Sequence, residues 1–147
     1  MRAIQNFTLI LLTLCIVLSA ETELADPEPS IIEPRRIVLS IDSGKVDEIH
    51  HVLGSANNIL KFYGPEKVEM IIIAYYHGIR AVQKTDRDIM IRVKALQLYG
   101  VEFIACGNTM RTKNIKESEL LEDVEIVTAG LVEIIERQIG GWISIIP

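Results

Sequence analysis

Short apolar runs alternate with amphipathic stretches along the chain from residue 35 to its end. The first run, RRIVLSI at 35–41, is rich in β-branched residues and stops at the turn-forming residues DSGK, as a buried strand does. Similar runs predict further strands at 67–76, 101–106, 124–127 and 142–147. Because these runs are apolar at consecutive positions, both faces of most strands are expected to be covered.

Between the strands, apolar residues recur every three or four positions, which indicates amphipathic helices. Helices are expected at 46–63, 85–100 and 129–139. Gly64-Pro65 ends the first helix, and Thr85 with Asp88 matches a capping box at the start of the second. The segment 77–84 is expected to form a loop.

The alternation of strands and helices predicts an α/β fold with three layers, α/β/α. Its centre would be a mostly parallel sheet of about five strands, with helices on both sides. The 147 residues suit one domain, which is expected to span 35–147.

The first 34 residues differ in composition from the rest. Residues 1–20 combine a short basic start, an uncharged apolar run and a small final residue, which predicts a signal peptide. Residues 21–34 are acidic and contain three prolines, which predicts a linker. The mature protein is then expected to be periplasmic or secreted. In the alternative, the uncleaved segment anchors the protein in the inner membrane, and only this segment contacts the membrane.

Charge and motifs argue against several classes of partner and cofactor. The formal net charge is −5 and no basic run occurs, so nucleic acid is not an expected partner. The sequence contains neither Gly-x-Gly-x-x-Gly nor a phosphate-binding loop, so no nucleotide cofactor is expected. It has no Gly-x-Ser-x-Gly elbow to support a serine hydrolase. Its three histidines lack metal-ligand spacing, so no metal site is expected.

Polar residues and glycines follow the first three predicted strands at their carboxyl ends. Ligands bind at this edge in open α/β sheets, so these loops are expected to share one ligand-binding region. The candidate site residues are Asp42, Ser43, His77, Gly78, Cys106, Gly107, Asn108 and Thr109.

Cys106 has the most distinctive chemistry of these residues. If the signal peptide, which contains Cys15, is removed, Cys106 has no disulfide partner in its own chain. A helix capped by Asn108 or Thr109 would point its amides towards the sulfur, which would stabilise a thiolate and lower the pKa of the thiol. A thiolate is the nucleophile that accepts or holds sulfur. In the alternative, Cys106 is a small buried residue that fills space in the core.

Other polar residues could assist the thiol. His77 could orient or deprotonate Cys106, since histidine titrates near neutral pH, or it could simply be a polar residue at a strand end. Basic residues also lie in the loops after the second and third strands, where they could attract a small anion such as thiosulfate or merely be solvated. These residues are Arg80, Lys84, Arg111 and Lys113.

Four segments together resemble the DsrE/DsrF-like family, in the order in which the family has them. The resemblance covers nearly everything after about Arg35, and it is closest to a branch with a strand-end Cys-x-Asn-Thr motif and a closing Gly-Trp strand. The segments are IVLSIDSGKVDEIHHVLGSANNILKFYG, VEMIIIAYYHGIRAV, GVEFIACGNTM and VEIVTAGLVEIIERQIGGWISIIP.

This resemblance implies an α/β fold, homo-oligomers that are commonly trimers or hexamers, and a link to sulfur oxidation and sulfur relay. In relay members of the family, a cysteine carries a persulfide and passes it to a partner protein. For this chain, the resemblance supports Cys106 as that cysteine. If the protein is such a carrier, we expect His77, Asn108 and the loop amides to stabilise the thiolate.

Two functions follow as hypotheses. In the first, the protein is a sulfur carrier or sulfurtransferase that holds sulfane sulfur on Cys106 and works with a sulfur donor or acceptor protein. In the second, an oligomer binds a small ligand or a partner at the same strand ends without catalysis, and Cys106 is buried in the wall. The sequence leaves open whether the protein turns over as an enzyme.

Overall fold

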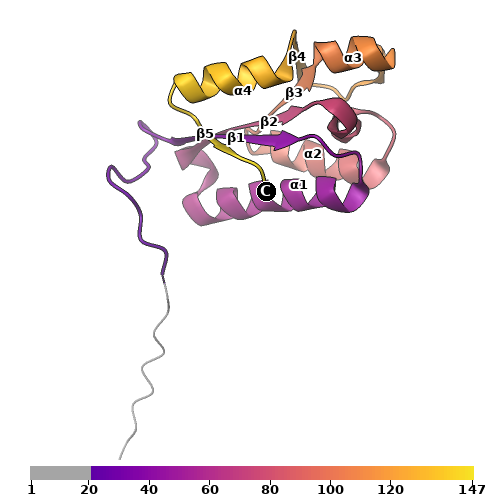
Figure 1. The fold of residues 1–147 in the computed structure, drawn as a ribbon. Coiled ribbons are helices and arrows are strands. Elements are labelled where there is room, and N and C mark those ends of the chain that lie inside the picture. Colours follow the sequence, from indigo (N-terminus) through magenta and orange to yellow (C-terminus); the bar gives the residue numbers. More distant parts are fainter. Residues whose placement is uncertain (1–20) are drawn as a thin grey trace, which may run out of the picture.

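Five parallel strands form one sheet in the order β4-β3-β2-β1-β5 in the computed structural model, which describes residues 21–147 (Figure 1). The strands are β1 (Arg35–Ile41), β2 (Val68–Ala74), β3 (Glu102–Cys106), β4 (Val124–Val127) and β5 (Ile143–Ile145). Every pairing between neighbouring strands is parallel. The predicted fold class and number of strands are therefore confirmed, although β2 and β5 are shorter than predicted.

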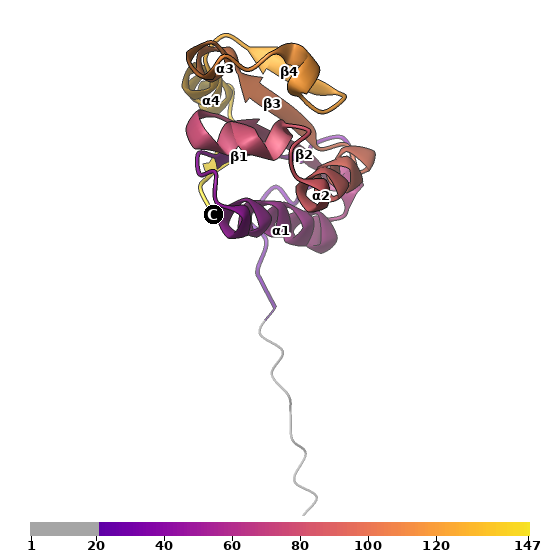
Figure 2. The same cartoon turned by 90° about the vertical axis from the view of Figure 1, so that its right-hand side faces the viewer.

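Helices cover both faces of the sheet and complete the three layers. Two perpendicular views show α1 and α2 side by side on one face and α4 on the other (Figures 1 and 2). The α-helices are α1 (Val46–Tyr63), α2 (Arg87–Leu98), α3 (Gly107–Lys113) and α4 (Gly130–Ile139). Three short 3-10 helices also occur: η1 (Pro65–Lys67), η2 (Tyr76–Val82) and η3 (Glu117–Glu119).

The apolar core lies on both sides of the sheet because consecutive strand residues point to opposite faces. Leu39 of β1 belongs to the larger cluster, which includes Ile49 and Leu53 of α1. Val38, its neighbour, belongs to a smaller cluster with Ile71, Ile73 and Ile104, against which Ile134 of α4 packs. Burial of each large aliphatic side chain contributes about 1.5–3 kcal/mol. Coverage of both faces explains why the strands read as continuous apolar runs.

The start of α2 differs from the prediction. The helix begins at Arg87, and the Asp86 carboxylate accepts hydrogen bonds from the amides of Asp88 and Ile89 at 3.1 and 3.3 Å. A carboxylate at this position satisfies free amides and interacts favourably with the positive end of the helix dipole. The predicted capping box at Thr85 is therefore wrong, and Asp86 is the cap.

The segment predicted as a loop at 77–84 is mostly helical. Residues Tyr76–Val82 form η2, and Gly78, Ile79, Ala81 and Val82 of this helix are buried. Buried backbone groups must find hydrogen-bond partners, and a 3-10 helix supplies them within a short segment. The loop prediction was wrong because it gave too little weight to these apolar residues.

The N-terminal predictions fall partly beyond the described residues. Residues 1–20, the predicted signal peptide, lie outside them. Residues 21–34 form neither helix nor strand, and the Arg35 guanidinium donates a hydrogen bond of 2.6 Å to the Ala25 carbonyl. Between residues 21 and 147, the structure contains no helix with the length and apolar character needed to cross a bilayer.

Candidate functional site

Cys106 is the last residue of β3 and lies between the starts of two helices. It pairs with Val127 of β4, and α3 begins at the next residue, Gly107. The loop after β4 leads directly into α4, which begins at Gly130. Cys106 itself therefore occupies the N-cap position of α3, and the predicted cap at Asn108 or Thr109 is wrong by two or three residues.

The sulfur of Cys106 is surrounded by groups that favour its ionised form. The Gly130 amide donates a hydrogen bond to Sγ at 3.2 Å. Burial by itself raises the pKa of this thiol, but the Gly130 amide, the Thr109 hydroxyl and amide, and the Asn108 amide together hold the pKa below its ordinary value. Only 6% of the residue is exposed, so these protein donors, and not water, favour the thiolate.

Two glycines allow the backbone to approach Cys106 closely. A Cβ atom on Gly130 would lie 3.1 Å from Ile73 Cγ2 and 3.2 Å from Cys106 Cβ. A Cβ atom on Gly107 would lie 2.9 Å from the Val127 carbonyl oxygen. Gly130 therefore lets the start of α4 come close to Cys106, and Gly107 lets the start of α3 pack against the end of β4.

Thr109 connects the thiol to the segment that follows β2. Its Oγ1 accepts a hydrogen bond of 2.9 Å from the Tyr76 amide, while its hydroxyl also favours the Cys106 thiolate. Tyr76 has a φ of 51°, in the left-handed region that non-glycine residues rarely adopt. The Tyr76 and His77 rings are in contact, with 3.9 Å between their centroids and an angle of 57° between their planes. This unusual backbone turn places both aromatic rings next to α3.

His77 is paired with α3 and not with the sulfur. Its Nδ1 lies 3.1 Å from Nζ of Lys113, whose ammonium group is also 5.6 Å from the centre of the Tyr76 ring. Within residues 21–147, no hydrogen bond joins His77 to Cys106. The structure thus brings His77 to the same edge of the sheet as the thiol without a direct contact between them.

An open hollow of about 770 Å³ lies at the carboxyl ends of β1 and β2. Its lining consists of the segment Asp42–Lys45, Glu48, Tyr76, His77 and Arg80. Three predicted site residues, Asp42, Ser43 and His77, therefore line one hollow, whereas Cys106 and the three residues after it do not. The predicted site is divided into two neighbouring groups, linked by the contact from Tyr76 to Thr109 and by the contact from His77 to Lys113.

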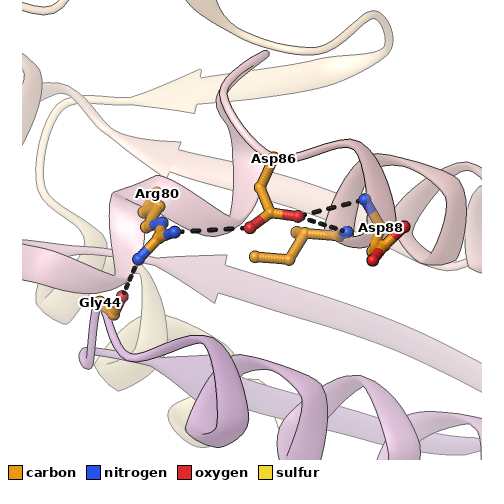
Figure 3. A network of polar contacts seen from close by, with 5 residues as sticks. Gly44, Arg80, Asp86 and Asp88 are labelled. Carbon is orange, nitrogen blue, oxygen red and sulfur yellow. Dashed lines mark hydrogen bonds and ion pairs between the residues drawn. The ribbon is translucent and has the colours of Figure 1, made fainter.

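Arg80 holds one wall of this hollow in place. Its guanidinium donates to the Gly44 carbonyl at 2.9 Å and to the Asp86 carboxylate at 3.4 Å, as Figure 3 shows. Asp86 is also the cap of α2, so this network connects the start of α1 to the start of α2.

Gly78, another predicted ligand-binding residue, has a packing role in the structure. Its amide donates a hydrogen bond of 2.8 Å to the Asp42 carbonyl. A Cβ atom at this position would lie 2.0 Å from the Ile41 carbonyl oxygen, so η2 can pack against the end of β1 only with glycine here.

The remaining predicted basic residues each have a separate partner. Lys84 donates to the Ser118 carbonyl at 3.1 Å, and Arg111 donates to the Asn108 side chain. Lys113 contacts His77, as described above. Among residues 21–147, no group of three or more His, Cys, Asp or Glu side chains is arranged to hold a metal ion.

Sequence reasoning missed two residues that shape the site. Gly130 is the third residue after the fourth strand, so the signal used for the first three strands, a polar residue or glycine shortly after a strand, could have identified it. Tyr76 was assigned to the end of a strand, and no sequence signal marked its left-handed backbone or its contact with Thr109.

The fold and this site define a class of small α/β proteins with a thiolate-favouring cysteine at the carboxyl edge of a parallel sheet. The model of the DsrE/DsrF-like family matches residues 42–145, and the chain belongs to this family, which is associated with sulfur relay. No curated protein matched the chain in sequence.

Several solved structures share the fold. The protein of unknown function MTH1491 from Methanobacterium thermoautotrophicum is 28% identical, with a TM-score of 0.73, and the match covers 77% of this chain and 99% of that one. The ychN protein from E. coli is 14% identical, with a TM-score of 0.62 and coverage of 78% and 99%. The protein of unknown function BT1422 from Bacteroides thetaiotaomicron is 12% identical, with a TM-score of 0.56 and coverage of 76% and 94%.

Proposed function

We propose that the protein is a sulfur carrier that holds sulfane sulfur as a persulfide on Cys106. The observation that carries this proposal is the position of Sγ at the starts of two helices, where it accepts a hydrogen bond from the Gly130 amide and the pKa of the thiol is lowered. A thiolate at neutral pH is the form that attacks sulfane sulfur. Membership of the DsrE/DsrF-like family adds independent support.

The proposed step conserves sulfur oxidation states overall. The Cys106 thiolate attacks the terminal sulfur of a donor R–S–SH, the donor S–S bond breaks, and R–S⁻ leaves with the electron pair. The product, Cys106–S–SH, keeps the donor proton on its terminal sulfur. Transfer to an acceptor thiolate repeats the step in the opposite direction, so the protein needs no redox cofactor for either transfer.

We also propose that the protein forms homo-oligomers through the outer face of α4. Four apolar side chains of this helix are 51% to 75% exposed: Leu131, Val132, Ile135 and Ile139. Their spacing places them on one side of the helix, and Leu131 follows Gly130, which contacts the thiol. An apolar face of this kind is typical of a protein–protein interface.

Export to the periplasm remains part of the proposal and rests on the composition of residues 1–20. N-terminal sequencing of protein isolated from the periplasm is expected to begin after Ala20 or Ala25. A start at Met1 in membrane fractions would instead support the anchored form.

The carrier function can be tested by intact-mass measurement of the purified protein after treatment with inorganic polysulfide. We expect one or more additions of about 32 Da, the mass of a sulfur atom, which a thiol reductant removes. Cys106→Ser is the control and is expected to show no addition. If Cys106 stays unmodified until the protein is unfolded, the alternative is favoured, in which a non-catalytic module binds a ligand or partner and the cysteine is buried.

A further inference from the structure

Two neighbouring isoleucines are strongly exposed just before the sheet begins. Ile31 and Ile32 are 72% and 91% exposed. They form the tip of a turn, in which the Ser30 amide donates to the Glu33 carbonyl at 3.0 Å and the Glu33 amide donates to Ser30 Oγ at 3.0 Å. Two reciprocal hydrogen bonds fix the backbone of this turn, so less conformational entropy is lost when its side chains bind a partner.

The turn belongs to residues 21–34, which we call the arm. The arm contains five carboxylates and no basic residue, and within residues 21–147 none of these carboxylates forms an ion pair. Pro29 of the arm is buried and lines a hollow together with Phe62 and Tyr63 of α1. The arm is thus packed against the end of α1, with an apolar tip and negative flanks that remain exposed.

An apolar hollow with a positive rim lies along α3. We call it the α3 hollow, and its volume is about 590 Å³. Met110, Ile115 and Ile126 line it, and Ile126 is 41% exposed. Its charged lining residues are Arg111 and Lys116, and neither forms an ion pair within residues 21–147. In a chain with a net charge of −5, this hollow is suited to a partner that is apolar and negative.

The tip of the arm and the α3 hollow are complementary in polarity and charge. The apolar part of the hollow has room for the two isoleucine side chains. Glu28 and Glu33 flank the isoleucines in sequence, so their carboxylates would lie near the cations at the rim. The other hollows match less well. The hollow at the ends of β1 and β2 contains carboxylates, and two between α1 and α2 have volumes of only about 240 and 250 Å³.

The arm cannot reach the α3 hollow of its own chain. The arm leads into the amino end of β1, whereas α3 follows the carboxyl end of β3, and the strands are parallel. The arm and α3 therefore lie at opposite ends of the sheet (Figure 1). The chain from Ile32 to Arg35 spans at most about 11 Å, whereas the seven residues of β1 extend for about 23 Å. A tip that occupies the hollow must come from another copy.

We propose that the arm of one copy docks Ile31 and Ile32 into the α3 hollow of a second copy. Because arm and hollow are different surfaces, this contact is head-to-tail, and such contacts form a closed ring where the rotation between copies permits it. Signal cleavage after Ala20 or Ala25 leaves the turn in the mature chain. The inference goes beyond the carrier function and does not depend on it. It also adds a contact that is separate from the apolar face of α4.

Photo-crosslinking from the tip tests this contact. Ile32 is replaced by p-benzoylphenylalanine, isotope-labelled and unlabelled protein are mixed, and the cross-linked peptides are identified by mass. We expect cross-links between chains that join the tip to residues 110–116 or to Ile126. The same replacement at Ile91, which is 57% exposed on α2, is the control and should give no such cross-link. Cross-links from the tip to the hollows between α1 and α2, or none between chains, would overturn the inference.

Reversal of charge tests the complementarity. Arg111→Glu with Lys116→Glu is expected to reduce the cross-link between chains at least about fivefold, because like charges then face each other. A second variant carries Glu28→Lys and Glu33→Lys, which reverses the charge of the arm. When the two variants are mixed, the cross-link should return, and only from the reversed arm to the reversed hollow. All four residues are exposed, so the fold should be retained, and circular dichroism verifies this.

Lys61→Glu with Lys94→Glu is the matched control. Both lysines are exposed and neither lines the α3 hollow, so the same change of charge should leave the cross-link unchanged. A cross-link that survives reversal of the hollow, or that mixing does not restore, would contradict the docking of the arm. The experiment is independent of Cys106 chemistry. A docked arm in a protein whose Cys106 resists polysulfide would uphold this inference and overturn only the carrier function.

Discussion

Cys106 owes its predicted reactivity to its neighbours, because a cysteine that is 6% exposed would ordinarily hold its proton. The Gly130 amide, the Thr109 hydroxyl and amide, and the Asn108 amide reverse this tendency and lower the pKa of the thiol. The folded thiol should therefore ionise at a lower pH than an ordinary cysteine thiol, because its pKa is held below the ordinary value. At neutral pH the thiolate fraction is expected to exceed that of a free thiol.

Replacement of Thr109 tests this account at a single side chain. Thr109→Val removes the hydroxyl and is expected to move the pH dependence of Cys106 alkylation to higher pH, because one interaction with the thiolate is lost. Loss of about 1 kcal/mol corresponds to a roughly fivefold slower reaction with iodoacetamide at neutral pH. Thr109→Ser retains a hydroxyl and should keep most of the wild-type rate.

Thr112→Val is the control for that measurement. Thr112 lies in α3, but its hydroxyl donates to the Asn108 carbonyl at 2.9 Å and does not contact the sulfur. The control should leave the pH profile of alkylation unchanged. Identical profiles for wild type and Thr109→Val would show that the hydroxyl has no influence on the thiol.

At the residue scale, the sequence made Cys106 a candidate site residue but did not predict its immediate environment. Cys106 was predictable because it ends an apolar run and is followed by glycine. Its donor Gly130 is the first residue of α4, 24 residues later in the chain, and only the tertiary structure brings it to Sγ. Asp42 and His77 were also predicted to be site residues. They line the hollow at the ends of β1 and β2 and do not contact the thiol because of the path of η2, and the sequence of η2 has no simple hydrophobic periodicity that predicts this path.

Among the elements, η2 determines the shape of the site, and Gly78 determines how η2 packs. Gly78→Ala would place a methyl group 2.0 Å from the Ile41 carbonyl oxygen. Because backbone atoms cannot move aside as a flexible side chain can, we expect a loss of about 3 kcal/mol or more in the free energy of unfolding. Urea denaturation followed by circular dichroism measures this loss.

Gly54→Ala makes the same chemical change at a site with room for it. Gly54 lies within α1, and the nearest atom to an added Cβ would be Arg92 Nη2 at 3.5 Å, an ordinary contact. Alanine is favoured over glycine inside a helix, so this variant should be about 0.5–1 kcal/mol more stable than the wild type. Equal stability of the Gly78 and Gly54 variants would contradict the packing role of Gly78.

At the scale of elements, hydrophobic periodicity predicts the long regular elements but not every helix start. The strand 35–41 and the helix 46–63 were predicted with the observed bounds, because their apolar patterns are long and regular. The start of α2 was missed because Thr85 and Asp86 are both good capping residues, and the choice depends on which side chain meets the free amides. Asp86 is preferred in the structure, where it also accepts from Arg80.

At the scale of the whole molecule, the exposed apolar face of α4 predicts an assembly. Leu131→Lys combined with Ile135→Lys is expected to convert an oligomer into monomers. About half of each side chain is exposed, so burying the remainder of both contributes about 1.5–3 kcal/mol per interface side. Size-exclusion chromatography with light scattering measures the mass of both forms.

The control substitutes two exposed apolar residues of α2 instead. Ile91 and Leu98 are 57% and 88% exposed, so Ile91→Lys with Leu98→Lys adds the same charge on the opposite face of the sheet. We expect this variant to keep the wild-type mass. A monomeric wild-type protein would contradict the proposed assembly through α4.

The three-layer architecture was predictable from the sequence because strands covered on both sides must be apolar throughout. The exposure of the apolar α4 face could not be predicted, since the apolar stripe of a helix has the same pattern whether the sheet or another subunit covers it. Only the structure shows that Ile134 packs on the sheet while Leu131, Val132 and Ile135 remain outside.

The central claim is that folding activates Cys106 towards sulfane sulfur, and the most direct measurement compares the rate of persulfide formation in the folded and the unfolded protein. The same inorganic polysulfide is added at neutral pH with and without denaturant, each rate is referred to a free thiol under the same conditions, and the mass increase of about 32 Da is followed over time. The lowered pKa of Cys106 predicts a faster reaction in the folded protein. A reaction that proceeds only after unfolding would contradict the account and assign Cys106 to the core.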